Sequence, residues 1–386
     1  MKIGIIGGAL GERIPEKPYK KWMDTISLRY YNKNNGDYMF EPGLAEGLKV
    51  RYKDVTDAVY IKNDLIEKEL QKNDVNFLAG LNLIYGWETS PHKYKQWIKI
   101  MKNKKNNIYP PYKEQEFLYD KGKYLMYYKK KGIPIAPTFI IRKQRDTDYI
   151  LQQVKKNNWE AFVLKPHHAY ANVDIKRFNM DDKHVQEKLK TFLQKNKKYP
   201  GFVCQEVMIG FKEHYEVKTF WINGEYKYHV AMKTTDGSVF SIDEISDESG
   251  SVYFGSNLVS QKVIQQVKKM GEKIVKHFPS VPIKGVTKPP LYLRLDFGCC
   301  QGNTLDTSKY FLNEIEYAGC RVLLDGAGGN AMDYWIRGYY EKACQLTNHT
   351  SKISKKKTKQ KSKKYKKGRS IDKQQYLQAI EDLKNI

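Results

Sequence analysis

The chain has 386 residues and a formal net charge of +25, with 68 Lys and Arg against 43 Asp and Glu. This length suffices for two or three domains with a proper core, and the sequence holds no run of about 18 apolar residues of the kind that spans a membrane. The N-terminal segment 1–13 has only a short apolar run before charges appear. We therefore expect a first strand and a turn there, and no secretory signal.

Cysteine usage indicates the redox environment. The five cysteines form no C-x-x-C pair, and the adjacent pair at 299–300 is a poor zinc pattern, because structural zinc sites space their thiolates. We therefore expect free thiols in a reducing compartment and a cytoplasmic location. The cysteines are Cys204, Cys299, Cys300, Cys320 and Cys344.

Residues 1–115 are predicted to form a small α/β domain. The glycines at 7, 8 and 11 lack the G-x-G-x-x-G spacing of a dinucleotide fingerprint, so we interpret them as a tight turn after the first strand. The Y-P-P-Y sequence at 109–112 marks the end of this domain. We expect the strands Lys2–Ile6, Ala58–Ile61 and Val75–Ala79 and the helix Leu65–Gln71.

Two further units are predicted over 116–200 and 201–350. The Gly-Ile-Pro sequence at 132–134 should end the first helix of the earlier unit. For 116–200 we expect the helices Glu116–Lys131, Asp146–Asn157 and Asp181–Lys195 and the strands Thr138–Ile141 and Trp159–Lys165. For 201–350 we expect several strands and the helices Val259–Phe278 and Asp333–Leu346.

The C-terminal segment carries much of the positive charge. Eleven Lys and Arg and no acids lie between 352 and 369, which leaves +14 on the rest of the chain. We expect a disordered Lys-rich linker over 351–369 and a C-terminal helix over 370–386. The linker suits a polyanion such as nucleic acid, and the charge of the body suits an anionic substrate. The compositional bias of an AT-rich genome is the alternative explanation for at least half of the body's excess.

Carboxylates cluster near the end of two short apolar segments. Alternation within Leu291–Asp296 and within Phe311–Glu316 places the charged residues of each on one side of its strand. A hairpin of the two strands would gather three carboxylates and one guanidinium, and hard oxygen ligands suit Mg²⁺. An ordinary hairpin with a solvated acidic face is the alternative. The residues concerned are Arg294, Asp296, Glu314 and Glu316.

Five short motifs follow one another in the chain: a D-K helix before G-I-P-x-x-P-T at 120–138, V-L-K-P at 163–166, Q-E-V-M at 205–208, R-x-D at 294–296 and N-E-x-E at 313–316. In this order they resemble the ATP-grasp superfamily, over about Asp120–Arg321. The resemblance implies an ATP-grasp fold of the α/β class, with α+β subdomains at 116–200 and 201–350 that follow an N-terminal α/β pre-grasp domain.

The resemblance also implies ATP and Mg²⁺ as cofactors and a role for each matching residue. Lys165 and Lys121 would bind the phosphates, with Lys123 as the competitor of Lys121. Either Glu213 or Glu216 would hold the ribose. The adenine would be held by the backbone of a hinge made of Gln205, Glu206, Val207 and Met208.

The remaining matches concern metal binding and catalysis. Asp296, Glu314 and Glu316 would ligate Mg²⁺. Arg294 and Lys218 are the catalytic candidates: Arg294 would stabilise charge on the transferred phosphoryl group, and Lys218 would pair with a phosphate or simply neutralise Glu216. Two departures stand out. Glu316 replaces the Asn that commonly ends the last motif, and 166–177 lacks the glycines of a flexible phosphate-covering loop.

Three functions are compatible with these observations. The leading hypothesis is an ATP- and Mg²⁺-dependent ligase that activates a carboxylate as an acyl-phosphate for attack by an amine. A kinase of a phosphorylated small molecule, such as an inositol phosphate, would use the same fold. A non-catalytic nucleic-acid-binding protein that acts through its basic tail is the third, although clustered acids bring nothing to such a protein.

Overall fold

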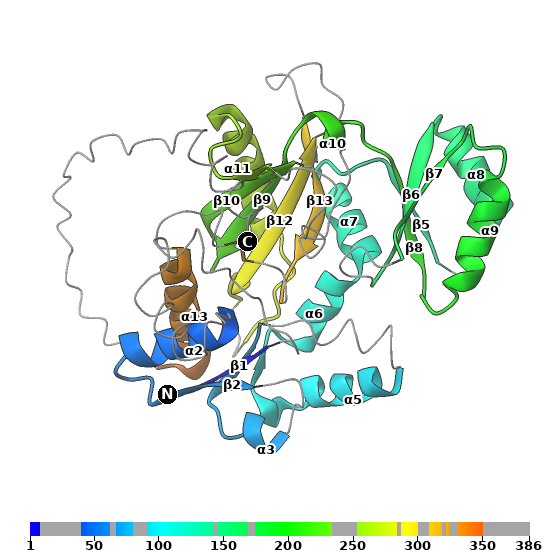
Figure 1. Ribbon diagram of the computed structural model, residues 1–386. Helices are drawn as coiled ribbons and strands as arrows, with labels where there is room; N and C mark the ends of the chain where they lie inside the picture. Colours follow the sequence, from blue (N-terminus) through cyan, green and yellow to red (C-terminus); the bar gives the residue numbers. More distant parts are fainter. Residues whose placement is uncertain are drawn as a thin grey trace, which may run out of the picture.

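The computed structural model describes eleven stretches of the chain and shows a mixed α/β protein with three sheets (Figure 1). None of the helices in these stretches has the length and apolarity that a membrane crossing requires. The predicted linker 351–369, the predicted helix 370–386, Cys300 and Cys320 lie outside them. The described residues are 1–7, 40–61, 67–79, 91–142, 146–168, 174–233, 253–283, 287–299, 309–318, 322–323 and 331–349.

The N-terminal sheet is parallel and has the strand order β2-β1-β3-β4. Its central strands read as continuous apolar runs because both faces are covered, as is usual for parallel sheets. The strands are β1 (Lys2–Ile6), β2 (Asp57–Ile61), β3 (Val75–Leu78) and β4 (Ile108–Tyr109), and the helices are α2 (Phe40–Arg51), α3 (Glu67–Leu70), α5 (Pro91–Lys102) and the 3-10 turn η2 (Lys104–Asn106).

Helix α2 was not predicted, because its sequence FEPGLAEGLKVR contains Pro42, Gly43 and Gly47. Proline is tolerated in the first turn of a helix, but each interior glycine costs about 1 kcal/mol relative to alanine. Leu44 and Leu48 lie one turn apart and are fully buried. Burial of this leucine stripe against β1 and β2 therefore overrides the poor helix propensity.

The predicted helix Glu116–Lys131 is two helices, α6 (Tyr112–Tyr119) and α7 (Lys121–Lys130). Asp120 has an extended backbone and ends the first helix. Its side chain accepts a hydrogen bond from the Lys123 backbone N–H, at 2.9 Å, and so caps the second helix. The single-helix prediction was wrong because periodicity alone does not show an N-cap within an otherwise helical pattern.

The middle sheet is antiparallel, in the order β5-β8-β6-β7, with α8 and α9 on its outer face at the right of Figure 1. Strand β8 pairs with β5 and β6, so residues 202–206 belong to the middle sheet. The prediction had placed them in the following unit, 201–350. The domain limits otherwise stay predictions. The elements are β5 (Thr138–Ile141), β6 (Ala161–Pro166), β7 (Lys176–Asn179), β8 (Phe202–Glu206), α8 (Thr147–Lys156) and α9 (Val185–Lys195).

The third sheet is antiparallel, in the order β11-β10-β9-β12-β13, and lies at the centre of the molecule (Figure 1). Helix α7 lies between this sheet and the middle sheet and contacts β13 and β8. The elements are α10 (Gly210–Glu213), β9 (Glu216–Ile222), β10 (Glu225–Lys233), β11 (Tyr253–Gly255), α11 (Gln261–Lys276), β12 (Tyr292–Cys299), β13 (Tyr310–Glu316) and α13 (Ala331–Thr347).

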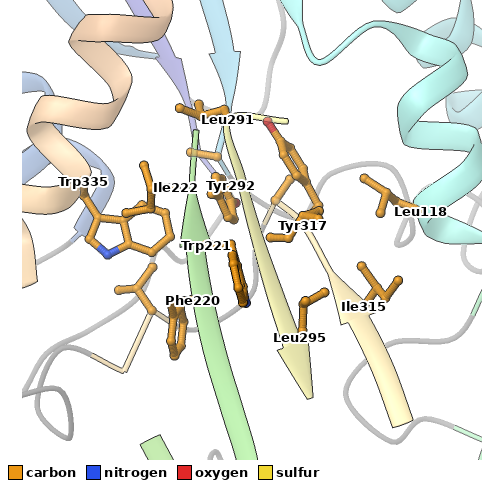
Figure 2. Close-up of a cluster of buried hydrophobic side chains, with 14 of the residues drawn as sticks. Leu118, Phe220, Trp221, Ile222, Leu291, Tyr292, Leu295, Ile315, Tyr317 and Trp335 are labelled. Carbon is orange, nitrogen blue, oxygen red and sulfur yellow. The ribbon is translucent and has the colours of Figure 1, made fainter. Parts of the chain in front are cut away.

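One face of this central sheet is divided into an aromatic half and a charged half. Phe220 and Tyr292 belong to the aromatic half and pack edge-on against Trp335 of α13, at ring-centroid distances of 6.4 and 4.8 Å (Figure 2). Lys218 lies on the same strand as Phe220, and Asp296 on the same strand as Tyr292, each at an even spacing. Their side chains therefore share that face of the sheet. The aromatic packing under α13 therefore fixes the strands that carry the charges.

Candidate active site

The charged half of the central sheet is a set of cross-strand neighbours on β9, β12 and β13. Asp296 lies opposite Lys218 on one side and opposite Glu314 on the other. In the next row Arg294 lies opposite Glu316. Directly opposite residues of an antiparallel pair have Cβ atoms about 4.5–5.5 Å apart, so the side chains of each row touch.

Two cations bridge pairs of carboxylates within this set. The Lys218 ammonium lies 2.6 Å from Asp296 Oδ2 and 2.8 Å from Glu216 Oε2. The Arg294 guanidinium donates to both carboxylate oxygens of Asp296, at 2.8 and 2.9 Å, and lies 3.1 Å from Glu316. Asp296 therefore accepts charge-assisted hydrogen bonds from two cations although its side chain is only 1% exposed.

A β-bulge adds a residue that the sequence did not single out. Asp296 lies opposite Glu314 but Phe297 lies opposite Leu312, so Asn313 is the extra residue of β13. Its side-chain amide donates to Glu216 Oε1 at 3.1 Å and accepts from the Lys165 ammonium at 3.3 Å. Asn313 thus links the end of β6 to the start of β9. The only signal for it was its place before Glu314 in the N-E-x-E motif.

Lys121 reaches the same site from the start of α7. Its ammonium lies 3.0 Å from Glu314 Oε1, and its backbone N–H donates to the His167 carbonyl, also at 3.0 Å. His167 is buried, and its Nδ1 lies 3.3 Å from the Asp120 carboxylate. Gly122 permits this approach, because a Cβ atom there would lie 2.8 Å from His167 Nε2. Lys123 instead pairs with Glu116 at 3.6 Å on an exposed surface, away from the cluster.

The cations decide the ionisation of the buried carboxyls. Burial alone would raise the pKa of Asp296, but Arg294 and Lys218 more than offset this effect and hold the pKa below its usual value. Burial acts likewise on Glu314, where Lys121 and Lys165 bring the pKa down to about 2. Burial raises the pKa of Glu316, and this effect exceeds the opposing one of Arg294.

The lysines fall into two classes. Burial would lower the pKa of Lys121 and of Lys218, but Glu314 in the first case and Asp296 in the second hold it above the usual value. Burial lowers the pKa of Lys165, since its direct partner is the neutral Asn313 amide and Glu314 acts only from a greater distance. Lys165 is therefore the buried lysine of the site whose charge is least compensated.

The three carboxylates predicted to ligate a metal ion fit that role. Asp296, Glu314 and Glu316 each offer an oxygen, and these three atoms lie within 4.8 Å of one another. Three hard, anionic oxygens suit Mg²⁺, which usually takes one or two carboxylates and completes its shell with water and phosphate oxygens. Roles in metal binding stay predictions for all three residues.

The predicted hinge lies at the end of β8, in the middle sheet. The buried Gln205 side chain donates to Thr138 Oγ1 at 3.0 Å, so it supports the sheet and does not reach the charged cluster. The backbone N–H groups of Glu206 and Val207 donate to Pro137 and Ala161 carbonyls. Met208 follows the strand and lies half-buried.

Of the two ribose candidates, Glu216 is the one that the structure places in the cluster, through its contacts with Lys218 and Asn313. Glu213 is the last residue of α10, and its side chain lies outside the described part of the structure. The adenine and ribose roles of the hinge and of both glutamates stay predictions.

No protein-family model matches the sequence, and no curated protein does. Solved structures are similar in fold at low sequence identity. D-cycloserine synthetase DcsG aligns with a TM-score of 0.60 and 13% identity, over 89% of this chain and 100% of that one. D-alanine–D-alanine ligase from Bacillus anthracis aligns with a TM-score of 0.53 and 14% identity, over 89% and 99%.

The ATP-grasp ligase PsnB, in complex with a minimal precursor, aligns with a TM-score of 0.51 and 12% identity, over 87% of this chain and 98% of that one. These alignments span the N-terminal sheet as well as the two sheets that hold the charged cluster. They confirm the resemblance that the five motifs indicated, at the level of the fold. The chain therefore has the ATP-grasp fold.

Proposed function

We propose that the protein is an ATP- and Mg²⁺-dependent ligase that joins a carboxylic acid to an amine. One observation carries the proposal: four cations and three closely spaced carboxylates converge between the middle and central sheets of an ATP-grasp fold. Similar structures include a D-alanine–D-alanine ligase and the ligase PsnB. A structure of the former is described as a complex with ATP.

The proposed reaction has two steps. An oxygen of the substrate carboxylate attacks the γ-phosphorus of ATP, and ADP leaves with the electron pair of the broken P–O bond. The amine then attacks the acyl carbon of the acyl-phosphate, loses a proton and expels inorganic phosphate. Nearly all of the catalysis of phosphoryl transfer lies in positioning the groups and offsetting their charge.

The residues of the cluster suit these tasks. Lys121 and Lys165 come from α7 and β6 and would bind phosphate oxygens from the side of the middle sheet. Lys218 and Arg294 lie on the central sheet and would stabilise charge that moves onto the transferred group. Mg²⁺, when bound by the three carboxylates, would neutralise phosphate charge. Before substrate binds, ion pairs hold Lys121, Lys218 and Arg294 in place, and a hydrogen bond to Asn313 holds Lys165.

The first test is nucleotide binding by the wild type and by a variant with Asp296→Asn and Glu314→Gln. We expect calorimetry to show Mg²⁺-dependent binding of ATP by the wild type and loss of it in the variant. Absence of nucleotide binding by the folded wild type would contradict the proposal. The exposed variant Glu116→Gln, outside the cluster, should bind ATP as the wild type does.

Product analysis then distinguishes the ligase from the kinase alternative. The protein is incubated with ATP, Mg²⁺ and pools of amino acids, and the products are separated by mass spectrometry. ADP, phosphate and a new amide in equal amounts support the ligase. A phosphorylated acceptor without free phosphate would replace the ligase proposal by the kinase alternative.

A further inference from the structure

The charged side chains of the site neutralise one another almost completely. Formal charges of four cations and four carboxylates cancel, and most of these groups are joined directly by ion pairs of 2.6 to 3.1 Å. The cations are Lys121, Lys165, Lys218 and Arg294, and the carboxylates are Glu216, Asp296, Glu314 and Glu316.

Two of the lysines occupy carboxylate oxygens that a metal ion would need. Lys218 binds Asp296 at 2.6 Å, and Lys121 binds Glu314 at 3.0 Å. Removing one partner of a buried ion pair is strongly unfavourable because it leaves an uncompensated charge. A metal ion that takes these oxygens must therefore displace ammonium groups, which then need new anionic partners.

Phosphate oxygens are such partners. A triphosphate that attracts Lys121 and Lys218 takes from Glu314 its direct ion-pair partner and leaves Asp296 with Arg294 alone. These carboxylates then attract a divalent cation. Each ligand thus removes the cost that the other would face alone. This exchange is a coupling free energy between two binding sites, and such coupling is reciprocal.

On the basis of the proposed function, we propose that Lys218 and Lys121 are internal counter-ions of the metal-binding carboxylates and couple binding of Mg²⁺ to binding of the triphosphate. In this arrangement the two ammonium groups keep the affinity for free Mg²⁺ low until a nucleotide engages them. Removing either ammonium group then has opposite effects on the two ligands. The affinity for nucleotide falls, while the affinity for Mg²⁺ alone rises.

Lys165 provides a matched control. It is a partly buried lysine of the same site and is predicted to bind phosphate, but its direct contact in the described residues is the Asn313 amide oxygen. The change Lys165→Met removes the same charge from the same region without releasing a directly bound carboxylate. A general electrostatic effect would change the Mg²⁺ affinity when any of the three lysines is replaced. The exchange of counter-ions changes it only when Lys121 or Lys218 is replaced.

The experiment is a calorimetric titration of Mg²⁺ alone into the full chain and into the variants Lys218→Met, Lys121→Met and Lys165→Met. We expect Lys218→Met and Lys121→Met to bind Mg²⁺ more tightly than the wild type, within the range of about 5–150-fold that is typical of coupling between sites. Lys165→Met should bind Mg²⁺ much as the wild type does. The charge-conserving variant Lys218→Arg should also stay near the wild type.

Thermal unfolding with and without Mg²⁺ extends the test to variants that fold poorly. A Lys218→Met or Lys121→Met chain that folds only in Mg²⁺ supports the proposal, because the cation then replaces the missing ammonium. Failure of both chains to fold at any Mg²⁺ concentration would overturn it. So would unchanged or weaker Mg²⁺ affinity in both, or an equal gain in Lys165→Met.

Titration of ADP into the same proteins, without Mg²⁺, separates this inference from the proposed function. If the wild type binds ADP and the lysine variants lose that affinity, the nucleotide site stands whatever the Mg²⁺ titration gives. If no protein of the series binds nucleotide, the proposed function fails. If Lys218→Met and Lys121→Met still bound Mg²⁺ more tightly in that case, the two lysines would be counter-ions of a metal site that has no nucleotide site beside it.

Discussion

Two regions of the described structure bury charged side chains and differ in how the charges are compensated. In the charged cluster of the candidate active site, Lys218 and Asp296 lie 2.6 Å apart. On α6, Glu114 accepts a hydrogen bond from the Val281 backbone N–H at 2.6 Å, and on α13, Lys342 donates to the Pro289 carbonyl at 2.7 Å. Within the described residues, neither Glu114 nor Lys342 forms a direct ion pair.

The pKa values follow this difference. Burial raises the pKa of Glu114 to about 7 and lowers that of Lys342 to about 8, and their distant attraction offsets only part of each shift. In the cluster, Glu314 keeps a pKa of about 2 despite its burial, because Lys121 lies against it. Direct pairing preserves charge in the interior, whereas a buried group without an ion pair moves towards its neutral form even when it is hydrogen-bonded to the backbone.

The largest effect should come from breaking the paired region. Asp296→Asn removes a carboxylate that two buried cations share, and loss of one partner of a buried ion pair costs about 3–5 kcal/mol of unfolding free energy. Urea unfolding of the ligand-free protein measures this cost. The matched control is Asp57→Asn, whose ion pair with Lys49 is exposed at 3.6 Å and should contribute about 0–1 kcal/mol. Equal losses in the two variants would contradict the distinction.

The unpaired region should instead show a pH dependence. The pKa of Glu114 is about 7 in the folded protein, above its ordinary value, so its contribution to stability is full below about pH 4.5 and is lost as the pH rises through 7. Glu114→Gln cannot ionise. Its stability relative to the wild type should therefore grow by on the order of 3 kcal/mol between pH 4.5 and pH 8, since one pKa unit corresponds to about 1.4 kcal/mol.

Urea unfolding over this pH range tests the prediction. Glu116→Gln, on the same helix but with a half-exposed side chain, is the control for the loss of a carboxyl group. A constant difference between Glu114→Gln and the wild type would show that Glu114 ionises in the folded state as readily as in the unfolded chain.

A smaller effect should follow from removing the neutral link of the cluster. Asn313→Ala deprives Lys165 of its direct hydrogen-bond partner and Glu216 of a donor, and an unsatisfied buried polar group costs about 1–3 kcal/mol. We expect lower stability by urea unfolding and weaker binding of ADP. Asn313→Asp should restore the contact with Lys165 but place a negative charge against Glu216. Full recovery of both properties in Asn313→Asp would show that Glu216 does not need the amide donor.

Strand alternation explains why the core of the cluster could be predicted from the sequence. The two-residue period alone places Arg294 and Asp296 on one face of their strand, and the register then brings Glu314 and Glu316 opposite them. The parts that escaped prediction depend on long-range structure. The bulge at Asn313 breaks the period, and the pairing of β8 with β5 joins segments more than sixty residues apart.

Glu114 and Lys342 escaped prediction for another reason. Both lie on helices, where a charged residue is usually solvated, and nothing in the local sequence shows that α6 and α13 bury these positions. The same limit applies to helix α2, whose glycines argue against a helix until Leu44 and Leu48 are seen in the core. Burial at contacts between distant elements is a property of the assembled fold.

The position of Lys121 has a mechanical consequence. Its backbone N–H is held by His167 in the middle unit, whereas its ammonium is held by Glu314 on the central sheet. A single residue thus connects the middle unit to the central sheet. If the middle sheet moved away from the central sheet, Lys121 would lose either its hydrogen bond to His167 or its ion pair with Glu314. The negative charge of Glu314 therefore resists such a movement.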